Sequence, residues 1–153
     1  MLSASEWVPL QLEALTRQVI RSSLQKMPRD KHIDVDVQPC SVHVTSDQAH
    51  NLALVINELA TNVTKYALQA RPKAQITVRI SRQDDIVRYE FRDEGPGCPT
   101  DVLRLERSHV GFNLIQNIVH SSLRGELELC NDQGAVALIQ FKAKVNTKDE
   151  EKP

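Results

Sequence analysis

The stretch from Ser46 to Leu68 constrains the fold most, because it has the pattern of one long amphipathic helix. Ser46 and Asp47 are good N-cap residues, and a periodic run from His50 to Leu68 follows them. Its apolar residues recur at helical spacing, at Leu52, Ile56, Leu59, Val63 and Ala67. The sequence therefore predicts a helix with one continuous stripe facing a core.

The opposite side of this helix carries a ladder of polar residues. Glu58, Asn62 and Lys65 follow one another at spacings of four and three, which stacks their side chains along one face. Taken alone, the ladder is explained as well by an ordinary solvated face. A functional interpretation therefore depends on the rest of the chain.

The segment before this helix predicts another helix and two short strands. Helical spacing of leucines and Val19 predicts a first helix over Leu10–Lys26, with Pro9 in a position that a first turn tolerates. The segments "HIDVDV" and "SVHVT" alternate apolar and polar residues on either side of Gln38 and Pro39. This pattern predicts a hairpin or an edge pair of strands.

The segment after the long helix predicts four more strands and a third main helix. "QITVRISR" and "IVRYEFRD" alternate around residues 83–85, as in an antiparallel hairpin. A helix is expected from about Gly111 to near Gly125, with Leu114 and Ile115 among its apolar residues. "ELELCN" and "AVALIQFKAKV" then predict a second hairpin across residues 132–134.

Composition excludes several classes of protein. With 153 residues, 41% of them hydrophobic, the chain fits one globular domain. Nineteen basic and twenty acidic residues give a net charge of -1, which argues against binding to nucleic acid. The apolar runs are short of the roughly 20 residues that span a bilayer. Three widely spaced cysteines suit reduced thiols. We therefore expect a cytoplasmic segment that contacts neither nucleic acid nor membrane.

A glycine-rich stretch, "DEGPGCP", begins where a predicted strand ends at Asp93. Gly95 and Gly97 lack a side chain, so the backbone there could approach a ligand closely. Such a stretch by itself is as often only a turn.

These motifs follow one another in an order that resembles the GHKL ATP-binding superfamily, and most closely the catalytic domain of sensor histidine kinases. "NELATNVTKYA" resembles their N box, "DEGPGCP" the G1 box, and "VGFNLIQNIVHSSLRGELEL" the last glycine box with the helix and strand after it. The resemblance spans nearly the whole chain. It implies a Bergerat-type α+β fold, a two-layer α/β sandwich with a mixed, mostly antiparallel sheet and three main helices on one face. It also implies that residues 1–146 form the ATP-binding catalytic domain, while residues 147–153 are a charged, disordered tail.

The resemblance implies roles for residues of the N box in the binding of ATP and Mg²⁺. Asn62 would offer a side-chain oxygen to Mg²⁺, which prefers oxygen ligands. Glu58, one turn earlier, would be the catalytic residue that orients or deprotonates the attacking group. Lys65 would face the phosphates, and Tyr66 would pack beside the nucleotide.

The glycine boxes complete the implied ATP site. Asp93 would accept a hydrogen bond from the adenine amine, which favours ATP over GTP. Gly95 and Gly97 would let the loop pass close to the base. Gly111 and Phe112 would lie at the start of a helix whose N-terminus attracts phosphate.

The activity that the resemblance implies is transfer of the γ-phosphate of Mg-ATP to a histidine. No histidine of this chain has the context of an acceptor, so the acceptor belongs to a histidine-bearing dimerisation domain of the parent kinase, with a response regulator downstream. Ser108 and His109 replace a family glycine, and Ala135 replaces a family threonine that helps to hold the adenine aspartate. Weaker nucleotide binding is therefore expected. Two alternatives stay open: a serine kinase of the anti-sigma type and a non-catalytic interaction module.

Overall fold

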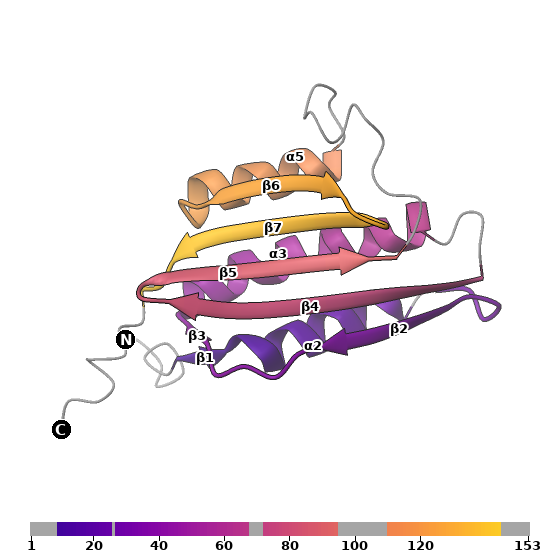
Figure 1. Ribbon diagram of the computed structural model, residues 1–153, viewed down its shortest axis with the longest axis horizontal. Coiled ribbons are helices and arrows are strands. Elements are labelled where there is room, and N and C mark those ends of the chain that lie inside the picture. The colour runs from indigo at the N-terminus through magenta and orange to yellow at the C-terminus, as the bar shows by residue number, and fades with distance from the viewer. Residues whose placement is uncertain (1–8, 26, 68–71, 95–109, 145–153) are drawn as a thin grey trace.

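A five-stranded mixed sheet forms one layer of the computed structural model, which describes residues 9–25, 27–67, 72–94 and 110–144 (Figure 1). The strand order is β2-β4-β5-β7-β6, and only β2 and β4 run parallel. The strands are β2 (His32–Val37), β4 (Lys73–Gln83), β5 (Ile86–Asp93), β6 (Glu126–Asn131) and β7 (Ala135–Lys142). The mixed, mostly antiparallel sheet is thus confirmed.

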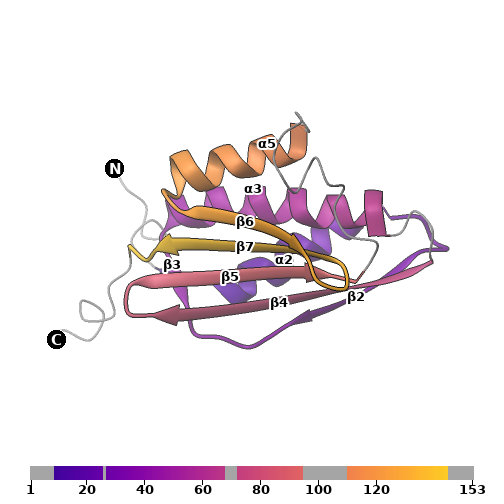
Figure 2. The same ribbon diagram turned by 45° about the horizontal axis from the view of Figure 1, so that its top comes forward.

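The second layer consists of helices that lie on one face of the sheet (Figure 2). They are α2 (Leu12–Leu24), α3 (Ser46–Asn62) and α5 (Val110–Asn117). Two of them continue as π-helices: η1 (Val63–Ala67) follows α3, and η2 (Ile118–Ser122) follows α5. The predicted two-layer sandwich with three main helices on one face is therefore confirmed.

The predicted pairing around Gln38 and Pro39 is wrong. β2 pairs with β4, whereas β3 (His43–Val44) pairs with a short strand that precedes the first helix, β1 (Leu10–Gln11). As a result, the first helix begins at Leu12, two residues later than predicted. Alternation identifies which residues of a strand face the core, but it does not identify the partner strand.

The N-cap of α3 also differs from the prediction. The cap is Thr45, which keeps an extended backbone, and neither Ser46 nor Asp47. The Thr45 hydroxyl accepts a hydrogen bond from the backbone amide of Gln48 at 3.1 Å. In return, the side-chain oxygen of Gln48 accepts a hydrogen bond from the backbone amide of Thr45 at 3.2 Å. This reciprocal capping box satisfies two amides at once, so it prevails over a single-residue cap.

Both hairpins after the long helix are confirmed. β4 and β5 meet at the pair Gln83↔Ile86, with Asp84 at a positive φ of 57°. β6 and β7 meet at Asn131↔Ala135.

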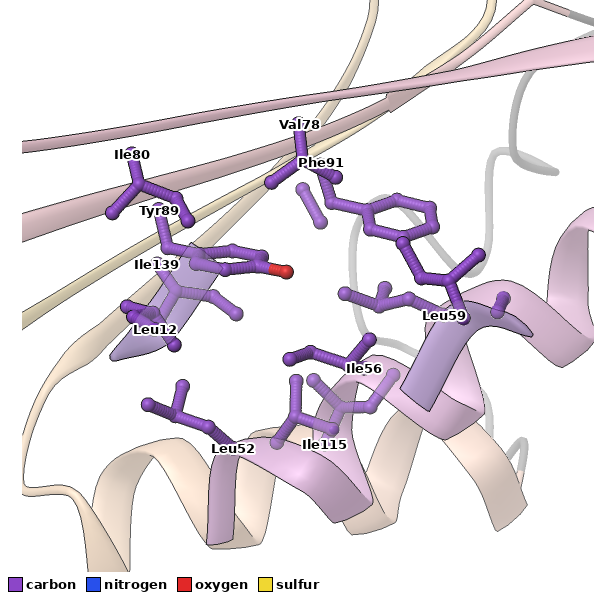
Figure 3. Close-up of a cluster of buried hydrophobic side chains, with 14 of the residues drawn as sticks. Leu12, Leu52, Ile56, Leu59, Val78, Ile80, Tyr89, Phe91, Ile115 and Ile139 are labelled. Carbon is purple, nitrogen blue, oxygen red and sulfur yellow. The ribbon is translucent and has the colours of Figure 1, made fainter. Parts of the chain in front are cut away.

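The hydrophobic core fills the space between the two layers (Figure 3). Leu52, Ile56 and Leu59 of α3 are buried there, as the periodicity predicted. Their partners in the core include Leu12, Val78, Ile80, Tyr89, Phe91, Ile115 and Ile139. Leu114 differs from the other apolar residues predicted for the third helix, because it is 38% exposed.

Candidate functional site

Three elements that carry predicted site residues reach the same end of the sandwich. Figures 1 and 2 show the C-terminal end of α3 and the C-terminal end of β5 there, together with the N-terminal end of α5. The fold therefore brings Asn62, Asp93 and Gly111 to one end of the molecule, although they come from separate parts of the sequence.

Asn62 is the last residue of α3 and lies directly before the π-helical turn of η1. Its side chain is only 8% exposed, and Nδ2 has no hydrogen-bond partner in the part of the chain that the structure describes. A buried polar group without a partner costs about 1 to 3 kcal/mol. Since such groups are rare in folded proteins, this amide fits a position that a ligand completes.

Glu58 and Lys65 lie on the more accessible side of the same helix. Glu58 is half-buried and Lys65 is exposed, and neither has an ion pair or hydrogen bond with the residues described here. Lys65 belongs to η1, whose wider turn alters the spacing of the predicted ladder. Both side chains are thus available to contact a ligand or an incoming substrate.

Asp93 ends β5 and lies on the same face of this strand as Tyr89 and Phe91, toward the helices. It is 9% exposed, and its Oδ1 accepts the backbone amide of Ala135 at 3.1 Å. A carboxylate has room for about four hydrogen bonds, so it can accept a donor from a ligand in addition. Because a backbone amide holds this oxygen, alanine at position 135 does not remove the contact.

The core links Asn62 and Asp93. Leu59 and Phe91 belong to one buried cluster (Figure 3). Asn62 follows Leu59 by almost one helical turn, and Asp93 is the next residue after Phe91 on the same strand face. The two polar side chains therefore border the same end of the hydrophobic core.

The remaining predicted site residues are only partly described. Gly111 is the second residue of α5, so the expected helix start is confirmed at that point. The backbones of Tyr66 and Phe112 lie in η1 and α5, but their side chains fall outside the described part. Gly95 and Gly97 lie outside it altogether, as do Ser108, His109 and the tail.

An ion-pair network that the sequence does not predict lies next to Asp93. Nη1 of Arg92 donates to the carbonyl oxygen of Asp132 at 3.0 Å and to its Oδ2 at 3.1 Å, and Nε lies 3.7 Å from Oε2 of Glu90. The hydrogen bond with Asp132 raises the pKa of Arg92, and the nearby carboxylates reinforce this effect. The two partners are 40 residues apart in the sequence, so no local pattern connects them.

The described side chains at this end of the sandwich include one buried asparagine and one buried aspartate. No group of three His, Cys, Asp or Glu residues that could hold a metal occurs within the described ranges. Mg²⁺ usually binds through one or two protein oxygens together with phosphates and water, for which a single asparagine is suitable. Among the described helices, none is long and apolar enough to cross a membrane.

Comparison with known proteins defines the class. The family model "Histidine kinase-, DNA gyrase B-, and HSP90-like ATPase" matches residues 47–147, which include Glu58, Asn62, Asp93 and Gly111. The chain therefore belongs to this family of GHKL ATPases.

Solved structures support the same fold. The histidine kinase domain of a blue-light activated histidine kinase from Erythrobacter litoralis EL346 is 23% identical, with a TM-score of 0.74 over 87% of this chain and 61% of that one. The mycobacterial sensor histidine kinase MprB is 18% identical, with a TM-score of 0.67 over 89% of this chain and 98% of that one.

The curated relatives that match are anti-sigma F factors. The anti-sigma F factor of Oceanobacillus iheyensis is 29% identical over 87 residues, which are 50% of this chain and 60% of that protein. The chain thus spans about three fifths of the length of the curated relatives it matches.

Proposed function

We propose that this chain is the ATP-binding catalytic domain of a two-component sensor histidine kinase. In this proposal, residues 1–146 bind Mg-ATP in the cytoplasm and transfer the γ-phosphate to a histidine on a separate dimerisation domain. A response regulator would receive the phosphoryl group next.

One observation carries the nucleotide site. Four polar or charged side chains are buried in the described part of the chain: Thr16, Gln48, Asn62 and Asp93. Thr16 bonds to Tyr89, and Gln48 caps α3, so both have a structural role. The other two lie at the end of the sandwich where α3, β5 and α5 meet, and Nδ2 of Asn62 has no hydrogen-bond partner among the described residues. Asn62 is therefore the group that a ligand would complete, and Asp93 lies at the same end of the molecule.

The chemistry of the two groups fits ATP. The Asp93 carboxylate is an acceptor held in place by Ala135, so it would accept the exocyclic amine of adenine. Asn62 would supply its side-chain oxygen to Mg²⁺ without adding charge, and its Nδ2, a donor, would bond to a phosphate oxygen. Lys65 and the start of α5 would attract the phosphates. Mg-ATP, when bound, supplies the phosphoryl group that is transferred.

Glu58 would serve the transfer step. It lies one turn before Asn62 and has no partner in the described part of the chain, so its carboxylate is available to accept a proton or hydrogen bond. We assign to it the orientation of the acceptor imidazole and the removal of its proton. A positioned base of this kind contributes typically about two to four decades in rate.

A serine kinase is the second candidate, because the curated relatives are anti-sigma F factors. The deciding experiment incubates the chain and radioactive ATP with the histidine-bearing domain of its parent kinase. We expect a label on that domain that is lost in acid and kept in base, as for phosphohistidine. An acid-stable label on a serine of a partner would favour the second candidate. ATP binding without any label would favour a non-catalytic module.

A further inference from the structure

Two neighbouring side chains of β5 hold the turn between β6 and β7 from opposite faces of the sheet. Arg92 bonds to Asp132, the first residue of this turn, through both the carbonyl oxygen and Oδ2. Asp93 bonds to the amide of Ala135, the first residue after the turn. Successive residues of a strand point to opposite faces, so the end of β5 forms hydrogen bonds at both ends of the turn, residues 132–134.

The amide of Ala135 connects this turn to the position of the Asp93 carboxylate. The β5–β7 pairing ends at Arg92↔Val136, and beyond it the Asp93 side chain accepts the next amide. The turn itself has a defined shape, with Gln133 at φ 59°, Gly134 at φ 136° and a 2.9 Å bond from the amide of Asp132 to the carbonyl of Gly134. A shift of this turn would therefore move a donor that holds the Asp93 carboxylate.

The Arg92–Asp132 pair is poorly suited to a large role in stability. The Asp132 side chain is 64% exposed, and exposed ion pairs contribute little to folding. Its geometry is more specific, because one guanidinium nitrogen reaches both a backbone and a side-chain oxygen of the same residue.

We propose that Arg92, acting through Asp132 and the amide of Ala135, is a positioning residue that holds the Asp93 carboxylate in place for adenine and so sets the preference for ATP over GTP. This inference rests on the proposed function, since it assumes that Asp93 contacts adenine. Arg92 lies on the opposite face of β5 from Asp93 and would not touch the nucleotide itself.

The test uses Arg92→Gln and has two readouts. In the nucleotide-free protein, NMR should show faster hydrogen exchange at the Ala135 amide, because the turn that precedes this amide is held less firmly. Calorimetry should show affinity for a non-hydrolysable ATP analogue reduced roughly three- to tenfold, with affinity for the GTP analogue unchanged. Arg92→Lys should restore part of the preference, since lysine keeps one charged donor. Asp132→Asn keeps the backbone acceptor and should give a smaller loss in the same direction.

Arg88→Gln is the matched control. Arg88 lies on the same outer face of β5, is exposed, and has no ion pair in the part of the chain described. It should change neither readout. Unchanged Ala135 exchange in Arg92→Gln would overturn the inference even if the wild type binds ATP. An equal loss of ATP and GTP affinity would overturn it as well, by showing a merely structural role. If exchange at the Ala135 amide is faster in Arg92→Gln but the wild type binds no ATP, Arg92 still positions the Asp93 carboxylate. The proposed contact between Asp93 and adenine is then wrong.

Discussion

Thr16 and Tyr89 meet within the core, whereas Asn62 and Asp93 lie where the core ends. The hydroxyl of Tyr89 lies 3.0 Å from Oγ1 of Thr16, so these two buried groups satisfy each other. Asn62 keeps an amide without a partner in the described part, and Asp93 is held by a backbone amide. A paired polar contact inside a core stabilises the fold, while an incomplete one at its border indicates a binding site. The two regions should therefore respond differently to substitution.

The largest effect is expected at Glu58, which lies one helical turn before Asn62 at the border of the core. Glu58→Gln keeps the shape of the side chain but removes the base, so phosphotransfer should fall by roughly two to four decades. Nucleotide affinity and the melting temperature should stay nearly unchanged. Single-turnover phosphotransfer and calorimetry with an ATP analogue measure the two quantities. A parallel loss of affinity would instead place Glu58 in nucleotide binding.

The next effect is expected at Asp93. Asp93→Asn replaces one acceptor oxygen by a donor, and the loss of a buried pairing costs about 1 to 3 kcal/mol, or roughly one to two decades in affinity for ATP. Calorimetry should also show that the wild type prefers ATP to GTP. Equal binding of both nucleotides by the wild type would contradict the role of Asp93 at adenine.

A substitution of Asn62 should have opposite effects on ATP affinity and on the free energy of unfolding. Asn62→Leu has nearly the same shape and removes the unpartnered amide, so the free energy of unfolding should rise by about 1 kcal/mol. The same change removes the oxygen offered to Mg²⁺, so ATP affinity should fall by about a decade and lose its dependence on Mg²⁺. Chemical denaturation and calorimetry with and without Mg²⁺ measure these effects. A stability loss would mean that Asn62 has a structural partner.

The sequence predicts the candidate site residues Glu58, Asn62 and Asp93 better than it predicts the contacts between strands that hold them. Glu58 and Asn62 lie in one helix, and Asp93 ends a strand with clear alternation, so local periodicity assigns each of them to its element. It placed Asn62 opposite the core, however, whereas the structure buries this side chain at the border of the core. The Arg92–Asp132 pair depends on the order β5-β7-β6, and the pairing of β2 with β4 depends on a crossover. Strand order is decided by packing of the whole sheet, which alternation within one strand does not encode. The same limit explains the wrong hairpin around Gln38 and Pro39.

The smallest effect on function is expected at the paired contact in the core. Tyr89→Phe leaves the hydroxyl of Thr16 without its partner, so the free energy of unfolding should fall by about 1 kcal/mol while ATP affinity stays unchanged. Adding Thr16→Val removes the second polar group, and the double variant should recover part of the loss.

The pH dependence of this variant tests the same contact. Burial raises the pKa of Tyr89 above its usual value, against the opposing effect of the Thr16 hydrogen bond. The folded protein therefore keeps a proton that the unfolded chain releases, so this contribution to stability is complete below pH of about 10 and is lost as the pH rises further. Phenylalanine cannot ionise, so the stability difference between wild type and Tyr89→Phe should narrow above pH of about 10. Denaturation curves for both proteins across that range provide the measurement, and a constant difference would show that Tyr89 ionises equally in the folded and unfolded states.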